Sequence, residues 1–532
     1  MKMFSIALLF LVAEGVVSLE CPAQKDAEVL ILGAGMAGIT AARTLHDSGI
    51  TNIKILEANS KRIGGRMRNV SFMGVQVETG AYWIHEMPEN PQTIGGPGVN
   101  PIWTLARDPS KCFAEVLKGN YTGESEYMDT NSTGNYNVVN AEPVIEEYNE
   151  IFFDKIFEND SDISVRDALR YEGWNPDTLL KQLVEWDKFD YSYATTTDRS
   201  SLPLLIAEYD QYKFEGESDF RVTDQRGYVS IVHCIAEPFS NKIELGAVVT
   251  SIDWNDECFC ADVAGQGRVC GDYGITTFSI GVLQNFLENG RFNGTLSSRK
   301  IAAIENSRMG LYFPILVSFP SSFWNTETDY ILRTDTRYGY YHALEPIGRG
   351  LPGSPAMCTV PLTGDEAKRV SSLTKNEIYN EIMDVMHLWY GSNIPNATDI
   401  EYYDWYNDEF YRGMFSNIPL NLTLEEKENL AVPEGRLYFS GEGVIVYSTG
   451  TVHAAYCSGI DSATDILEKK GLSERSTFLP KCEDGTTMPP SQTPSPTPTT
   501  TAPPSSAYSV GSTSLISLII ALFVASLFAA FH

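Results

Sequence analysis

Apolar and polar residues near the N-terminus follow a pattern that predicts a strand, a helix and a second strand in close succession. Residues 29–32 (Val-Leu-Ile-Leu) form a short apolar run, as in a strand buried on both faces. Ile39, Ala42 and Leu45 then recur at helical spacing, and residues 53–57 form a second strand pattern. This order predicts a βαβ unit.

Similar patterns predict further elements along the chain. Residues 74–85 alternate as one strand, and residues 101–219 carry longer polar helices, which indicates an inserted domain. Because a strand and a helix return near the end of the chain, we expect the last strand to fold back beside the first. In all, we expect helices at 144–157, 179–186, 374–390 and 452–469, and strands at 243–254, 269–279 and 436–442.

Three glycines at the spacing G-x-G-x-x-G join the first strand to the first helix. Gly33 permits a tight turn, Gly35 lets the backbone approach a pyrophosphate, and Gly38 lets the helix pack closely on the strand. The helix N-terminus offers N–H groups to phosphates, and Glu57 at the end of the second strand can hold ribose hydroxyls. A surface glycine turn is the alternative, but strand, helix and acid together favour a dinucleotide. The acid disfavours the 2′-phosphate of NADP, which leaves NAD and FAD.

Length and charge narrow the class of protein. A chain of 532 residues, 43% of them hydrophobic, can bury a large core and is expected to contain more than one domain. It carries 39 basic and 69 acidic residues, a net charge of −30. This balance argues against nucleic acid as a partner and favours either an acidic solvated surface or cationic partners.

The N-terminus has the pattern of a secretory signal peptide. Lys2 precedes an apolar run at 4–13, and small residues follow near Ser18, so residues 1–18 are expected to be removed. Seven N-x-S/T sequons without proline agree with export; they begin at Asn69, Asn120, Asn131, Asn159, Asn293, Asn396 and Asn421.

Nine cysteines are expected to pair in part if the chain reaches an oxidising compartment. Cys258 and Cys270 flank a turn predicted at 265–267, so a cross-strand bridge between them is plausible, with Cys260 as the rival partner for Cys270. No histidine cluster accompanies this cysteine pair, so no metal site is predicted.

The C-terminal part changes composition twice. Residues 486–513 are rich in Pro, Ser and Thr, which predicts an extended stalk. Residues 515–531 are apolar, and only His532 follows them. Small residues at 505–507, a short spacer and this tail favour a GPI-attachment signal over a tail-anchored membrane helix.

Several segments together resemble the flavin-dependent polyamine oxidases of plants and fungi, over about residues 27–470. Gly64-Gly65-Arg66 resembles the signature of flavoprotein amine oxidases, which makes FAD the expected cofactor. The segments that carry the resemblance are 29–66, 80–83, 224–228, 410–417 and 438–442.

The resemblance implies an α/β fold in which a Rossmann-like FAD-binding domain is interleaved with an α+β substrate-binding domain. The site is expected at the interface between the two domains. The implied segments are 27–105, 220–311 and 430–472 for the FAD-binding domain, and 106–219 and 312–429 for the substrate-binding domain.

The resemblance also implies roles for individual residues. Val249 would act through its backbone at the adenine, and Trp405 would pack near the flavin. The full set expected to bind FAD is Gly33, Ala34, Gly35, Gly38, Glu57, Gly64, Gly65, Arg66, Val249, Trp405 and Glu442. Trp83, Ser192, Tyr312, Phe415 and Thr451 are expected to contact substrate, and His85 is the expected catalytic residue.

Four positions depart from the resemblance. Pro314 replaces a lysine that in most relatives reaches the flavin through a water. Ser192 stands where plant members carry a tunnel acid, and Thr451 where an aromatic residue faces Phe415. His85 takes the position of a glutamate and can hydrogen-bond or deprotonate an amine.

These observations favour a secreted, surface-anchored oxidase of polyamines such as spermine, spermidine or their acetylated forms. In such an enzyme a hydride passes to the flavin, and dioxygen is reduced to hydrogen peroxide. Two alternatives remain: an inactive FAD-binding protein of the cell surface with a role in binding or adhesion, or an oxidase of other amines or amino acids. For amino acids, no motif arginine clearly awaits a carboxylate.

Overall fold

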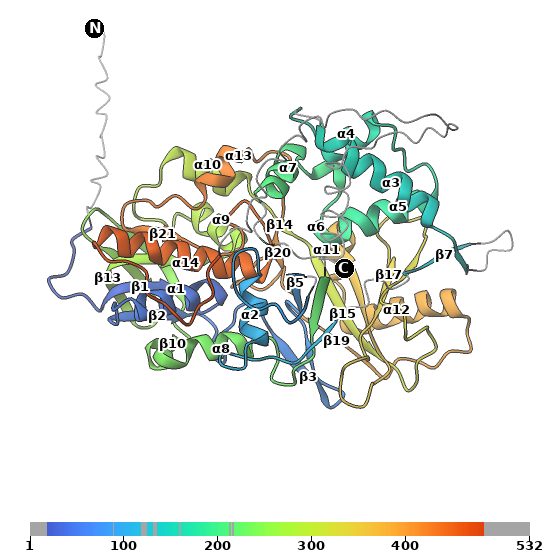
Figure 1. Ribbon diagram of the computed structural model, residues 1–532, viewed down its shortest axis with the longest axis horizontal. Helices are drawn as coiled ribbons and strands as arrows, with labels where there is room; N and C mark the ends of the chain where they lie inside the picture. The colour runs from blue at the N-terminus through green and yellow to red at the C-terminus, as the bar shows by residue number, and fades with distance from the viewer. Residues whose placement is uncertain are drawn as a thin grey trace, which may run out of the picture.

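A computed structural model (Figure 1) describes residues 19–88, 90–118, 125–130, 136–158, 161–211, 214 and 218–482. The expected signal peptide, stalk and GPI-signal tail lie outside these residues. Within them, no helix combines the length and the apolar character needed to cross a membrane.

The first of two seven-stranded sheets contains the predicted βαβ unit. Its order is β10-β2-β1-β13-β12-β11, and β21 pairs with β13. β1 pairs in parallel with β2 and with β13, and its last four residues are fully buried, as the apolar run predicted. The strands are β1 (Ala27–Leu32), β2 (Ile53–Glu57), β10 (Ile243–Leu245), β11 (Val249–Trp254), β12 (Phe259–Val263), β13 (Gly267–Thr276) and β21 (Leu437–Phe439).

The last strand does not lie beside the first, so that prediction is wrong. β13 separates β21 from β1, because its residues from Gly274 onward pair with both. The helices carry the late contact instead: α14 (Val452–Lys469) packs on α1 (Met36–Asp47). Gly459 permits this packing, since a Cβ there would lie 2.3 Å from the carbonyl oxygen of Ala37.

Two predicted strands are each split in the structure. Residues 74–85 form β4 (Val75–Glu78), which pairs with β3 (Asn69–Phe72), and β5 (Trp83–Met87), which pairs with β9 (Ser218–Val222). The break is at Gly80, whose missing Cβ would lie 1.8 Å from the Arg66 carbonyl oxygen. Residues 243–254 likewise divide into β10 and β11 at Gly246, where φ is +72°.

The second seven-stranded sheet has the order β19-β15-β18-β17-β16-β7-β8. Pro314 lies in β15 opposite Pro361 of β18, beyond the end of the β15–β19 pairing, where a proline costs no hydrogen bond to a second neighbour. The strands are β7 (Glu126–Thr130), β8 (Tyr136–Val139), β15 (Tyr312–Ser318), β16 (Ile331–Arg333), β17 (Ala343–Pro346), β18 (Met357–Thr363) and β19 (Asp399–Tyr402).

The predicted helices at 144–157, 179–186 and 374–390 are present as α3 (Glu142–Asp154), α5 (Leu179–Glu185) and α12 (Lys375–Tyr390). α5 continues through a π-helical turn at Trp186–Asp190 into α6 (Tyr191–Tyr193). The other helices are α2 (Pro101–Arg107), α4 (Val165–Tyr171), α7 (Leu202–Asp210), α8 (Ser230–Ala236), α9 (Ile280–Glu288), α10 (Ser298–Asn306), α11 (Gly364–Val370) and α13 (Leu424–Asn429).

The two sheets belong to separate cores built from interleaved parts of the chain. In Figure 1 the first sheet with α1 and α14 occupies one end of the molecule, and the second sheet with α12 the other. Short strands such as β5, β14 (Met309–Gly310) and β20 (Phe415–Ser416) lie between them. β6 (Val116–Lys118) pairs with β9, which also pairs with β5, and β14 pairs with β20. The first core includes α2 and Cys112, so it extends past the boundary expected at residue 105.

Disulfides join cysteines that are distant in sequence. Cys260, not Cys258, bridges to Cys270, because these two residues stand directly opposite in the β12–β13 ladder. Cys258 lies just outside the ladder and bonds to Cys21. Cys112 pairs with Cys234 and Cys457 with Cys482, while Cys358 is a buried free thiol.

Candidate active site

A large pocket is lined by residues from both halves of the chain. It contains about 1860 Å³ of space, counting its open mouth. Of the residues predicted from the sequence, all but Ala34, Gly38 and Trp405 line it.

The glycine loop at one end of the pocket has the geometry of a phosphate cradle. Gly33 has a φ of +111°, and a Cβ there would lie 2.3 Å from Thr277 Oγ1. α1 begins directly after Gly35, and among the described residues no side chain caps it, so its first N–H groups suit an anion. Gly65 closes the other side, since its Cβ would lie 3.4 Å from the Gly35 Cα.

Ala34 and Gly38 support this loop from behind. The Ala34 N–H donates to Glu57 Oε2 at 2.8 Å and so orients the carboxylate. A Cβ on Gly38 would lie 2.1 Å from the carbonyl oxygen of Gly33, so only glycine lets the helix approach the turn this closely. Both residues therefore shape the pocket without lining it.

Glu57 lies at the end of β2, and its side chain lines the pocket. Its Oε1 accepts the N–H of Asn59 at 2.8 Å. Burial raises the pKa of Glu57, and the hydrogen bonds from Asn59 and Ala34 oppose that shift. Val249, the first residue of β11, lines the same end. These positions fit the adenosine half of a dinucleotide.

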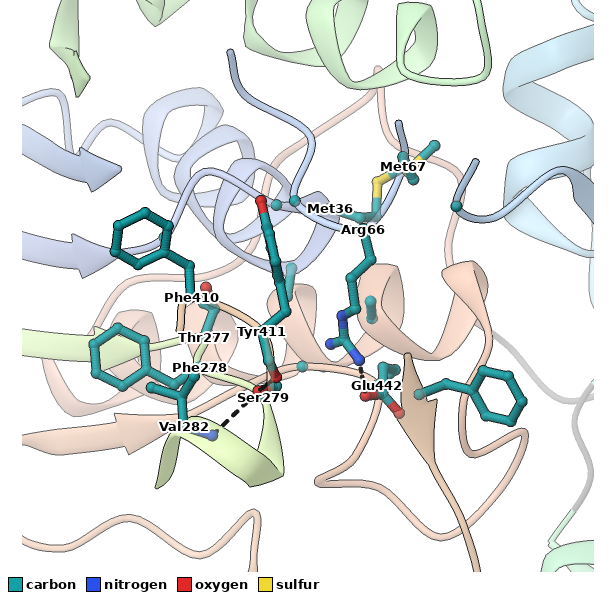
Figure 2. Close-up of a pocket in the computed structure, with 18 of the residues that line it drawn as sticks. Met36, Arg66, Met67, Thr277, Phe278, Ser279, Val282, Phe410, Tyr411 and Glu442 are labelled. Atoms are coloured by element: carbon teal, nitrogen blue, oxygen red, sulfur yellow. Dashed lines mark hydrogen bonds and ion pairs between the residues drawn. The ribbon is translucent and has the colours of Figure 1, made fainter. Parts of the chain in front are cut away.

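Arg66 and Glu442 meet deeper in the pocket. Arg66 Nη1 lies 2.5 Å from Glu442 Oε1 and donates to the carbonyl oxygen of Met414 at 3.1 Å. The other oxygen of Glu442 accepts the Ser416 N–H at 3.1 Å. Figure 2 shows this pair on one side of the pocket and Phe278, Phe410 and Tyr411 on the other.

Sequence reasoning missed the aromatic residues Phe278, Phe410 and Tyr411 as pocket lining. The aromatic character of the 410–417 motif was the available signal for two of them. Trp405, which was predicted to pack near the flavin, lies behind Tyr411 with ring centroids 4.9 Å apart. Trp405 is buried and its indole N–H donates to the carbonyl oxygen of Thr79 at 2.8 Å. It therefore packs behind Tyr411 and does not face the pocket itself.

The N-terminus of α14 faces the pocket. Gly450, Thr451, Val452 and Ala455 all line it, and Thr451 Oγ1 caps the helix by accepting the Ala454 N–H at 3.1 Å. Because the N-terminus of this 18-residue helix lies at the pocket, the positive end of the helix dipole is directed at this wall. Negative charge on a bound ring system would be stabilised there.

His85 lines the pocket from β5 and is held by a buried carboxylate. Its Nδ1 lies 3.1 Å from Asp219 Oδ2 on β9, and Asp219 Oδ1 accepts the Glu86 N–H at 3.0 Å. Burial raises the pKa of Asp219 to about 6, and His85 opposes this shift. When Nδ1 donates to Asp219, Nε2 carries the lone pair, as a general base requires.

The remaining predicted substrate residues line the same pocket as His85. Tyr312 lies 6.0 Å from Phe415 and 5.7 Å from Tyr191, measured between ring centroids. Ser192 is buried, and within the described part of the chain its hydroxyl has no hydrogen-bond partner. The full group on the pocket wall is Tyr82, Trp83, His85, Tyr191, Ser192, Tyr312, Phe415 and Thr451.

Within the described part of the chain, no carboxylate stands on the wall among these aromatic residues. The carboxylates of the described lining are Glu57, Glu409 and Glu442. Pro314 is buried in the second sheet and is not part of the described lining. A cationic ligand would meet aromatic faces, which attract cations, and the acids behind them.

Comparisons with known proteins agree with this geometry. The sequence model of the family described as flavin containing amine oxidoreductase matches residues 36–467. Polyamine oxidase 1 of Zea mays is 30% identical over 465 residues, covering 82% of this chain and 90% of the relative. Polyamine oxidase 6 of Oryza sativa is 31% identical over 464 residues, with the same coverage.

A solved structure of putrescine oxidase bound to putrescine matches the fold with a TM-score of 0.67, covering 83% of this chain and 99% of that one at 15% identity. The glycine cradle, the acid at the end of β2 and the open end of α1 fit FAD. The predicted fold class, family and cofactor are thereby confirmed. The chain belongs to the flavin-containing amine oxidoreductases, with FAD as its cofactor.

Proposed function

We propose that this protein oxidises polyamines. One observation carries the proposal: the far end of the pocket combines aromatic faces with a histidine backed by a buried aspartate, a setting suited to a cationic amine that must lose a proton. The similarity to polyamine oxidases of maize and rice supports the same substrate class.

The residues have distinct roles in this proposal. The N–H groups of α1 and the glycine loop bind the pyrophosphate, and Glu57 binds ribose hydroxyls. Bound FAD supplies the site that accepts two electrons from the carbon next to the amine nitrogen. Tyr312 and Phe415 orient the chain of the amine. His85 takes a proton from the amine so that its nitrogen lone pair is available, while Asp219 fixes the ring.

Dioxygen is the proposed second substrate and hydrogen peroxide the proposed product. We therefore expect purified protein to form peroxide with spermine, spermidine or an N-acetylated polyamine. Monoamines and amino acids serve as the comparison set. Peroxide formed only with amino acids would make the protein an amino-acid oxidase. No peroxide with any compound would favour a non-catalytic flavoprotein, the alternative raised by Pro314 in place of a lysine.

We further propose that the protein is exported and held at the cell surface by a GPI anchor. The disulfides among the described cysteines support export, because such bonds persist in oxidising compartments. The tail at 515–531 supports the anchor. Phosphatidylinositol-specific phospholipase C should release the protein from intact cells, whereas retention on the membrane would contradict the anchor.

A further inference from the structure

A second buried carboxylate lies behind the aromatic wall, on the side formed by Tyr82. Glu345 is a residue of β17 and is only 2% exposed. The Tyr82 hydroxyl donates to Glu345 Oε2 at 3.0 Å. The hydroxyl of Tyr312, which also lines the pocket, lies 3.0 Å from that of Tyr191. The Tyr82 hydroxyl thus links the pocket to the buried carboxylate of Glu345.

This link connects the pocket to the interior of the second sheet. Tyr82, Tyr191 and Tyr312 all line the pocket, whereas Glu345 is not part of the lining. The Tyr82 hydroxyl can accept one hydrogen bond from the pocket while it donates another to Glu345, so it can pass a proton between them.

Several charged or titratable groups face Glu345 from the elements around it. Burial raises the pKa of Glu345 to about 7; Arg221 on β9 and the Tyr82 hydrogen bond oppose this shift, and Asp329 adds to it. Cys358, on the neighbouring strand β18, is a neutral buried thiol because burial raises its pKa. Arg221 also donates to the backbone oxygen of Ile347 at 3.1 Å, so it is shared rather than paired with Glu345.

The tyrosines and the glutamate are suited to different tasks. Burial raises the pKa of Tyr82 and of Tyr312 well above the ordinary range, so neither hydroxyl can remain ionised at neutral pH. Each can transfer a proton only by releasing another. Glu345 can keep the proton, since its ionised and neutral forms are both accessible near pH 7.

We propose that Glu345 accepts, through Tyr82, a proton from an ammonium group of the bound polyamine other than the one that is oxidised. This inference rests on the proposed function. One N–H bond of that ammonium breaks, the Tyr82 hydroxyl gains one proton and releases another, and an O–H bond forms on Glu345. The products are a neutral amine and a neutral carboxylic acid, and no electrons move. His85 remains the acceptor for the amine that is oxidised.

The test compares the pH dependence of flavin reduction by spermine, without oxygen, in FAD-loaded variants. In the wild type the rate should rise with pH through about 7, as Glu345 becomes able to accept a proton. Glu345→Gln and Tyr82→Phe should each be slower at pH 7 by roughly a hundredfold and approach the wild type as the pH nears the pKa of the free amine.

A matched control is Tyr341→Phe, which removes a hydrogen bond of the same kind, 3.0 Å from the Tyr341 hydroxyl to Glu381, outside the pocket lining. This variant should keep the wild-type profile. If Glu345→Gln and Tyr82→Phe also keep it, or are slowed equally at every pH, the proposed proton route is wrong.

Infrared difference spectra provide a readout that does not need turnover. Anaerobic mixing of the wild type with spermine should produce a carboxylic acid band that is missing in Glu345→Gln. A band without bleaching of the flavin would support the proton route and contradict the proposed oxidase. Bleaching without the band would support the oxidase and overturn the proton route.

Discussion

His85 and Asp219 show how a single pair of residues sets the chemistry of the pocket. They come from neighbouring antiparallel strands, β5 and β9, whose pairing brings residues more than a hundred positions apart into contact. Asp219 is 1% exposed and also accepts the N–H of Glu86, so its position is fixed from two sides. The imidazole is therefore held in one orientation at the pocket wall.

We predict that His85→Ala and Asp219→Asn each slow anaerobic flavin reduction by spermine by about 100-fold, because each removes the oriented base. FAD should be retained, since neither residue belongs to the phosphate cradle. Stopped-flow absorbance measures the rate.

His46→Ala is the control for this pair, because His46 lies 3.4 Å from Asp47 in a similar contact on α1, away from the pocket lining. It should reduce at the wild-type rate. If spermine reduces the flavin of His85→Ala at the wild-type rate, His85 is not the base. If the two pocket residues act as a unit, the double variant should be no slower than His85→Ala alone.

At the scale of elements, α1 and the turn before it make the cofactor site. The helix can begin at the pocket only because Gly38 lies against the Gly33 carbonyl without a side chain between them. Gly64 belongs to the second loop, and its N–H donates to the Ala34 oxygen at 2.9 Å, which ties the two glycine loops together. The cradle is thus a property of close backbone packing.

We predict that Gly38→Ala weakens FAD binding at least about tenfold, roughly 1.4 kcal/mol, because a methyl group 2.1 Å from a backbone oxygen forces the helix away from the turn. Equilibrium titration of the apoprotein with FAD measures the effect.

Gly74→Ala is the matched control. Gly74 has a φ of +86° and open space around its Cβ position, so alanine there strains the β3–β4 turn without touching the cradle. It should lower the thermal midpoint and leave FAD affinity unchanged. Equal loss of affinity in both variants would mean that general destabilisation, and not the cradle, explains the result.

Local elements were predictable from the sequence, because their signals lie within a few residues. The βαβ unit, the hairpin at 265–267 and the helix at 452–469 are present where the patterns placed them. The alternation of apolar and polar residues predicted two continuous strands, but Gly80 and Gly246 interrupt them. These breaks depend on the backbone conformation and on the neighbouring segment, which the alternation does not report.

Contacts between distant segments were not predictable in this way. Asp219 and Glu345 stand behind His85 and Tyr82 only because separate strands meet at the pocket. Strand register decided that Cys260 pairs with Cys270, and Cys21 lies 237 residues from its partner Cys258. The resemblance placed Trp405 near the flavin, yet Tyr411 occupies the lining position beside it.

At the scale of the whole molecule, interleaved segments of the chain enclose one pocket. The part around the first sheet contributes the glycine loops, Glu57 and α14. The part around the second sheet contributes Tyr312 of β15 together with Tyr191 and Ser192 of α6. The pocket that we propose for cofactor and amine therefore lies where the two halves of the chain meet.

The most direct test of this central claim is anaerobic mixing of the purified, FAD-loaded protein with spermine, spermidine and their N-acetylated forms. We predict that at least one of them bleaches the oxidised flavin band and that admitting oxygen restores it. A flavin that stays oxidised with every one of these amines would contradict the assignment as a polyamine oxidase.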